Sequence, residues 1–130
     1  MASSPSGPDG PTGGNAGSSA PKVQRRRSLR AVFAADIAGF SGRMSLNETS
    51  TVNALSEIRT IGRRALDAHD GWLFGMPGDG LFATFESAVS AVQCALDMQL
   101  DLEGRPHLQD TPLRIGIHLG EVIILSLIHI

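Results

Sequence analysis

Apolar and polar residues change their spacing several times along this 130-residue chain, and each change marks an expected element. Five consecutive apolar residues, 31–35, end in a single carboxylate, Asp36, and a turn with Gly39 follows. A short apolar run of this kind predicts a buried central strand from about Leu29 to Asp36. Because an ionised carboxylate beside a core is costly without a cation or several donors, we expect Asp36 to have such a partner.

Two segments have the spacing of amphipathic helices. Apolar residues recur every three or four positions from about Asn47 or Thr49 to His69, with Asn47 as the expected N-cap. The same spacing predicts a second helix from about Ser87 to Leu102, which Ser87 can cap.

The remaining patterned segments predict strands. Two short apolar runs flank the turn-forming residues 77–80 and predict an antiparallel hairpin within 71–85. Alternation from Leu113 to Gly120 predicts a last strand that continues to about Ile124. The order strand, helix, strand, strand, helix, strand is that of a ferredoxin-like βαββαβ fold in the α+β class. In that fold the end of the first strand and the hairpin tip lie side by side, so we expect Asp79 near Asp36.

Composition narrows the classes of protein. The chain has 11 Lys and Arg against 13 Asp and Glu, so its net charge of −2 predicts neither a nucleic-acid partner nor a membrane surface. No apolar run reaches the roughly 18 residues of a membrane span. Cys94 is the only cysteine, which excludes an internal disulfide and favours a cytoplasmic location.

The N-terminal segment has a different composition from the rest of the chain. Of residues 1–21, 17 are Ala, Ser, Pro or Gly, and a run of Lys and Arg follows. Such a segment has little apolar surface to offset the entropy of ordering. We therefore expect residues 1–28 to form a disordered tail with a basic run, ahead of a folded domain over 29–124.

The pair Asp36 and Asp79 is the candidate site. Two carboxylates that come close repel, and they can share a proton or share divalent metal ions. The tight turn at Gly39, Phe40 and Ser41 can cradle phosphate oxygens with backbone N–H groups, which favours Mg²⁺ bridging to a nucleoside triphosphate. The alternative is that Asp36 caps a helix and Asp79 is an ordinary turn residue.

Three blocks of sequence resemble a known family. FAADIAGFS, GDGLFATF and RIGIHLGEV, which lie within residues 31–41, 71–85 and 113–123, resemble successive blocks of the class III adenylyl/guanylyl cyclase catalytic domain. The resemblance covers about Arg30 to Ile124. It implies a nucleotidyl cyclase palm, conversion of ATP to 3′,5′-cyclic AMP and pyrophosphate, and a homodimer that builds the sites between two copies.

The resemblance also implies roles for single residues. Asp36 and Asp79, with the Ile37 carbonyl, would hold two Mg²⁺ or Mn²⁺ ions. The nucleotide would lie on the backbone of the glycine-containing segments, a set that consists of Gly39, Phe40, Ser41 and Gly78.

The chain departs from the family pattern in three places. Gly75 stands where many adenylyl cyclases have an adenine-reading lysine, so ATP is favoured over GTP only by the overall resemblance. The family's transition-state asparagine and arginine have no counterpart here, so we expect a C-terminally truncated domain that is inactive alone, with catalytic residues unknown. Residues 125–130 resemble a translated sequencing adapter and are expected to be non-native.

Three other functions remain open from the sequence. A degenerate cyclase-homology module that binds nucleotide or dimerises without catalysis would fit Gly75. A guanylate cyclase would share the same metal residues. A diguanylate-cyclase palm has the same fold, but the chain lacks the Gly-Gly-acid-acid-Phe hairpin expected of it.

Overall fold

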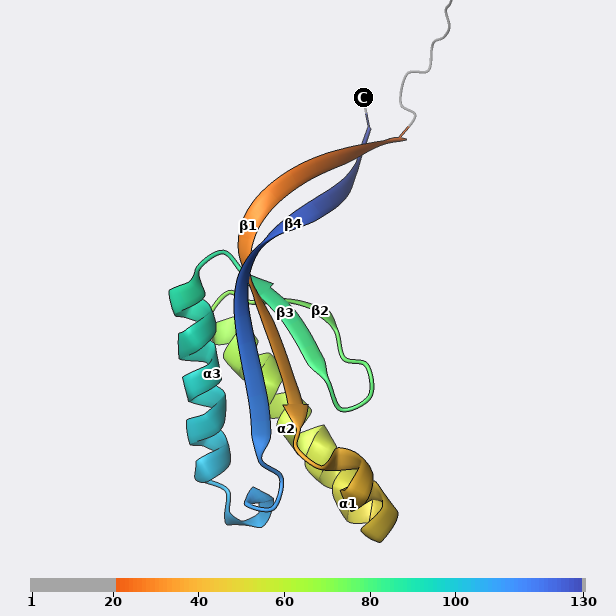
Figure 1. Cartoon of the computed structure of the whole chain (residues 1–130), viewed down its shortest axis with the longest axis vertical. Helices are drawn as coiled ribbons and strands as arrows, with labels where there is room; N and C mark the ends of the chain where they lie inside the picture. Colours follow the sequence, from red (N-terminus) through yellow and green to blue (C-terminus); the bar gives the residue numbers. More distant parts are fainter. Residues whose placement is uncertain (1–20, 130) are drawn as a thin grey trace, which may run out of the picture. The chain divides into compact units, whose positions relative to one another are not determined.

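The computed structural model describes residues 21–129, which form four strands, three α-helices and one 3₁₀ turn. Figure 1 labels the strands and the α-helices and colours them by their position in the sequence. The strands and helices are β1 (Pro21–Ile37), α1 (Phe40–Leu46), α2 (Glu48–Ala68), β2 (Trp72–Gly75), β3 (Leu81–Phe85), α3 (Ala88–Glu103), η1 (Pro106–Leu108) and β4 (Leu113–His129).

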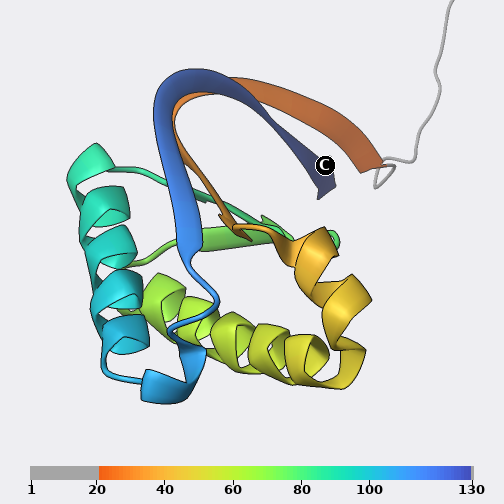
Figure 2. The same ribbon diagram turned by 60° about the horizontal axis from the view of Figure 1, so that its bottom comes forward.

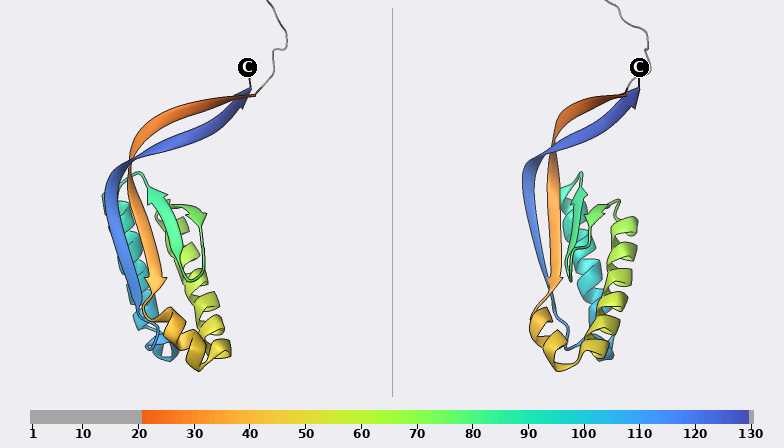
Figure 3. Two further views of the ribbon diagram at one scale, coloured as in Figure 1. Left: turned by 45° about the vertical axis from the view of Figure 1, so that its right-hand side comes forward. Right: turned by 90° about the vertical axis from the view of Figure 1, so that its right-hand side faces the viewer.

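The four strands form an antiparallel sheet in the order β2-β3-β1-β4. β1 pairs with β3 from Ala31 opposite Phe85 to Ala35 opposite Leu81, and β2 pairs with β3 as a hairpin (Figure 3). Helices α2 and α3 contact each other and β3, and they lie against one face of the sheet (Figure 2). This is the α+β arrangement predicted from the sequence, and it places the end of β1 beside the hairpin.

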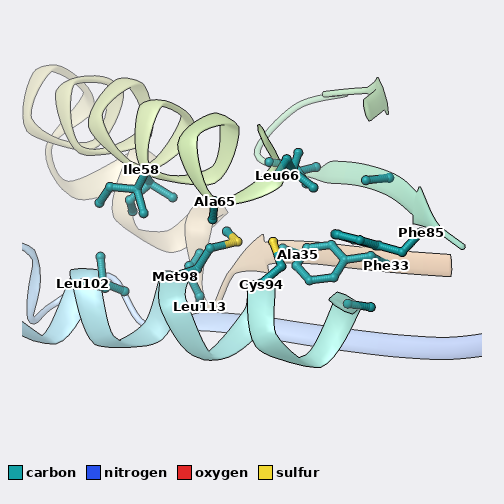
Figure 4. Close-up of a cluster of buried hydrophobic side chains, with 14 of the residues drawn as sticks. Phe33, Ala35, Ile58, Ala65, Leu66, Phe85, Cys94, Met98, Leu102 and Leu113 are labelled. Atoms are coloured by element: carbon teal, nitrogen blue, oxygen red, sulfur yellow. The ribbon is translucent and has the colours of Figure 1, made fainter. Parts of the chain in front are cut away.

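The core lies between this sheet face and the two helices (Figure 4). In β1 the buried side chains alternate, as expected for a strand with one covered face: Ala31, Phe33, Ala35 and Ile37. Phe33 packs against Phe85 of β3 with ring centroids 5.6 Å apart. From α3, Cys94 is fully buried, and this burial raises the pKa of its thiol to about 11.

The predicted helix caps are confirmed, and one helix was missed. The Asn47 side chain accepts a hydrogen bond from the Ser50 N–H, and the Ser87 side chain accepts one from the Ser90 N–H. The short helix α1 precedes α2, where only a turn was expected. None of the seven residues of α1 is buried, so its sequence lacks the repeating apolar positions that indicate a helix packed against a core.

Strand β1 begins at Pro21, so the prediction of a disordered tail is wrong for residues 21–28. Pairing with a neighbouring strand satisfies the backbone there, although the side chains are mostly polar. Residues 1–20 lie outside the described range. The non-native origin of 125–130 stays a prediction, although β4 continues through Leu125 to His129.

The described chain divides into two compact units. One is Leu29–Glu121, which contains the helices, the hairpin and the core. The other contains the outer segments of two strands, Pro21–Ser28 of β1 and Val122–His129 of β4. Within residues 21–129, no helix has the length and apolar character needed to cross a membrane.

Gly71, which follows α2, occupies a position too tight for a side chain. A Cβ there would lie 2.6 Å from Leu66 Cδ2 and 2.7 Å from Phe85 Cζ. We expect Gly71→Ala to lower the free energy of unfolding by about 1–3 kcal/mol, because a core atom must move. Urea denaturation measures this. The matched control is Gly42→Ala, where a Cβ meets nothing within 4 Å; an equal loss in both variants would contradict the prediction.

A charged cluster joins α2 to α3 and η1. Glu57 accepts hydrogen bonds from Arg105 at 2.7 Å and pairs with His107 at 2.9 Å, and Arg105 also donates to Asp101. The His107 and Arg105 hydrogen bonds lower the pKa of Glu57 below its ordinary 4.5.

Because the folded-state pKa of Glu57 is depressed, its contribution to stability is present above pH 4.5 and is lost as the pH falls through the folded-state value. We expect the melting temperature of Glu57→Gln to fall less than that of the wild type between neutral pH and about pH 3. Glu103→Gln, on the last residue of α3, is the control and should follow the wild type. An equal fall in the melting temperature of Glu57→Gln and of the wild type over this pH range would contradict the prediction.

Candidate functional site

Within the Leu29–Glu121 unit, the end of β1, the β2–β3 turn and the start of β4 line an open cavity of about 520 Å³. Its charged residues are Asp36, Asp79 and Arg114. The other lining residues are small or apolar: Ala34, Ala35, Pro77, Gly80, Phe82, Ile115 and Gly116. The structure therefore brings the two predicted carboxylates to one cavity.

The direct partner of Asp36 is an arginine that the sequence did not single out. Arg114 on β4 donates from Nε to Asp36 Oδ1 at 2.9 Å and from Nη2 to Oδ2 at 3.0 Å. Both side chains are substantially exposed, 41% for Asp36 and 68% for Arg114. An exposed ion pair of this kind contributes little to stability, so a stronger cation can displace Arg114 at low cost.

Asp79 is held from the end of β1. Its Oδ2 accepts a hydrogen bond of 3.0 Å from the backbone N–H of Ile37, the residue after Asp36. The Ala38 N–H in turn donates to the Pro112 carbonyl just before β4, at 2.9 Å. These two bonds connect the hairpin turn, the end of β1 and the start of β4 around the cavity.

The charges of the site act on one another. The Asp36 carboxylate raises the pKa of Arg114 above its ordinary value through hydrogen bonds and through its charge, and the charge of Asp79 adds to this. Arg114 therefore stands in the field of both carboxylates. A cation bound between these carboxylates would experience the same attraction.

The other predicted site residues lie on the turns beside the cavity. Gly39 has φ +71° and precedes α1, which begins with Phe40 and Ser41; none of the three is among the residues that line the cavity. Gly78, with φ +59°, forms the β2–β3 turn next to Asp79. A Cβ at Gly75 would meet only Pro77 Cδ, at 3.8 Å, so a side chain fits there but none is present.

The residues at the cavity fit a hard divalent cation in part. Carboxylate oxygens are the ligands that Mg²⁺ prefers, and Mg²⁺ is commonly bound by one or two carboxylates together with substrate phosphates. Among residues 21–129, no group of three or more His, Cys, Asp or Glu side chains is placed to hold a metal ion. The two carboxylates therefore require additional oxygen ligands, such as those of a triphosphate or water.

Arg114 is the site residue that sequence reasoning missed. Its position at the start of the RIGIH strand gave a signal, since that strand neighbours β1 in the predicted fold. The pairing with Asp36 depends on how β4 and β1 lie beside each other, which an alternating pattern does not specify.

Comparisons with known proteins agree on one class. No protein-family model matches the chain. "Putative adenylate cyclase 3" of Rhizobium meliloti (strain 1021) is 34% identical over 108 residues, which are 79% of this chain and 18% of that protein. The chain thus spans less than a fifth of this curated relative.

Solved structures give the same class. An adenylate/guanylate cyclase/hydrolase from Silicibacter pomeroyi aligns with a TM-score of 0.67 and 33% identity over 78% of this chain and 62% of that one. A bacterial light-regulated adenylyl cyclase has a TM-score of 0.71 and 22% identity over 82% of this chain and 36% of that one, which shows the fold alone. The fold is thus that of nucleotidyl cyclases. The chain belongs to the nucleotidyl cyclase family, as a class III adenylyl/guanylyl cyclase homology domain.

Proposed function

We propose that the chain supplies the metal- and triphosphate-binding part of an adenylate cyclase, which converts ATP to 3′,5′-cyclic AMP and pyrophosphate. The observation that supports this most directly is the convergence of Asp36, Asp79 and Arg114 on one cavity in a domain of cyclase fold. Two carboxylates and an exposed arginine are suited to bind a triphosphate together with its metal ions.

In this proposal Asp36 and Asp79, with the Ile37 carbonyl, hold two Mg²⁺ or Mn²⁺ ions. When bound, the ions supply activation of the ribose 3′ oxygen and neutralisation of the triphosphate charge. Arg114, once released from Asp36, pairs with phosphate oxygens, for which its planar fork of donors is suited. The Ile37 N–H keeps the Asp79 carboxylate turned toward β1.

The turn at Gly39, Phe40 and Ser41, and the turn at Gly78, would meet the triphosphate through their backbones. Backbone N–H groups in tight turns of this kind can donate to phosphate oxygens. The ribose 3′ oxygen would then give its proton to solvent water and attack the α-phosphorus. The bond from the α-phosphorus to the bridging oxygen breaks, and pyrophosphate leaves.

A second copy of the chain is the proposed partner. Trp72 and Phe74 on the edge strand β2 are 58% and 59% exposed, and large aromatic side chains in such positions favour protein interfaces. A dimer would also bring to the site groups that this chain does not place there.

The absence of a side chain at Gly75 favours a second candidate function. Gly75 offers nothing to contact a base, so a nucleotide-binding module without catalysis, or a cyclase that accepts GTP, is the alternative. The three candidates share the metal site and differ in whether they form a cyclic nucleotide and in which one.

The test is to incubate the complete gene product that contains these residues with ATP or GTP and Mn²⁺, and to separate the products by chromatography. We expect cyclic AMP and pyrophosphate in equal amounts, with less cyclic GMP from GTP. Nucleotide binding without any cyclic product would favour the non-catalytic module. The absence of both nucleotide binding and cyclic product would contradict all three candidates.

A further inference from the structure

The turn that bears Asp79 is weakly held by its own hairpin. The β2–β3 ladder ends at Gly75 opposite Phe82, with a register shift between Leu73 and Gly75. Beyond it, one backbone bond closes the turn, from the Gly80 N–H to the Pro77 carbonyl at 2.8 Å. Gly residues in such a turn add conformational freedom, so the direction of Asp79 requires support from outside the hairpin.

That support comes from Arg59, on the face of α2 that meets the hairpin. Its Nη2 donates to the Gly78 carbonyl and lies 3.4 Å from the Met76 carbonyl. Gly78 directly precedes Asp79, whose carboxylate accepts from the Ile37 N–H. The turn is thus fixed to α2 through its backbone and to β1 through the Asp79 side chain.

One atom of the Arg59 side chain is placed unfavourably for the stability of the fold. Its Nε is buried and has no hydrogen-bond partner among residues 21–129. A buried donor without a partner lowers the stability of the fold, and Arg30 Nε is the other buried side-chain atom of this kind among the described residues. Arg63, one turn further along α2, donates from Nη2 to the Met76 sulfur at 3.8 Å and provides an internal comparison.

We infer that Arg59 is a positioning residue for Asp79: by binding the Gly78 carbonyl it holds the hairpin turn so that the Asp79 carboxylate faces the metal cavity. This inference rests on the proposed function, because it assumes that Asp79 binds a divalent cation. Arg59 itself touches neither metal nor nucleotide in this assignment and acts only through the turn.

The test uses Mn²⁺ alone as the probe, bound to the 130-residue chain and followed by electron paramagnetic resonance at a temperature well below the melting temperature of every variant. We expect Arg59→Gln to weaken Mn²⁺ binding about tenfold, the effect of losing a residue that orients a metal ligand. Arg59→Lys keeps the positive charge but lacks the planar guanidinium group with its several N–H donors. It should therefore bind Mn²⁺ more tightly than Arg59→Gln but more weakly than the wild type. Arg63→Gln is the matched control and should bind Mn²⁺ as the wild type does.

A double variant separates positioning from a general effect on the fold. In an Asp79→Asn background, Arg59→Gln should change the residual Mn²⁺ affinity by less than twofold, because its target is already gone. The inference is overturned if Arg59→Gln binds Mn²⁺ normally, if Arg63→Gln loses as much, or if the Arg59 effect persists in the Asp79→Asn background. If Arg59→Gln does not fold, Arg59→Lys decides: weakened binding supports the inference and unchanged binding overturns it. If Asp79→Asn itself leaves Mn²⁺ binding unchanged, the proposed metal site fails instead.

Discussion

Asp36→Asn and Asp79→Asn variants of the complete gene product are expected to form cyclic nucleotide about 10²–10³-fold more slowly than the wild type, because each removes a negative charge that holds the metal ions at the triphosphate. Asparagine keeps the size of the side chain and its ability to accept a hydrogen bond, so the Ile37 N–H keeps a partner in Asp79→Asn. The measurement is the initial rate of cyclic AMP formation at saturating ATP and Mn²⁺.

The loss of activity is separable from a loss of fold. The Asp36–Arg114 pair is exposed, so its removal should change the free energy of unfolding little. Asp67→Asn, an exposed position on α2, is the matched control and should keep full activity. Normal turnover by either site variant would show that the carboxylate in question binds no essential metal.

Phe33→Ala is expected to lower the free energy of unfolding by about 3–5 kcal/mol, a large part of the total for a domain of this size. Phe33 is fully buried and packs on Phe85, at the centre of the cluster between β1, β3 and α3. Truncation leaves a cavity that the close-packed neighbours fill only in part.

Phe33→Leu provides a milder form of the same test, with an expected loss of about 1–1.5 kcal/mol. Leu46→Ala, at an 89% exposed position at the end of α1, is the control and should change stability by about 0.5 kcal/mol or less. Urea denaturation followed by circular dichroism measures all three. A Phe33→Ala domain as stable as Leu46→Ala would contradict the assignment of the core.

The sequence predicted those parts of the fold that depend on local pattern. The alternation through Phe33 and Ala35, the caps at Asn47 and Ser87, and the hairpin around Pro77–Gly80 all follow from rules that act over a few residues. The juxtaposition of Asp36 and Asp79 then followed from the order of the elements alone.

The features that were missed depend on contacts between distant residues. Arg30 follows the basic run, but its side chain is only 13% exposed and donates to the Thr84 hydroxyl on β3 at 3.3 Å. Two other interactions also join residues on different elements: the ion pair of Arg114 with Asp36, and the hydrogen bond from Arg59 to the Gly78 carbonyl. Composition and periodicity contain no information on such pairs.

A double-variant cycle of Mn²⁺ affinity on the 130-residue chain tests whether Asp36 and Asp79 bind one and the same metal–triphosphate site. We expect Asp36→Asn and Asp79→Asn each to weaken Mn²⁺ binding about tenfold or more. The double variant should bind Mn²⁺ little more weakly than the weaker-binding single variant, because both substitutions remove the same site. Unchanged binding in either single variant, or two losses that simply add, would contradict a single shared site.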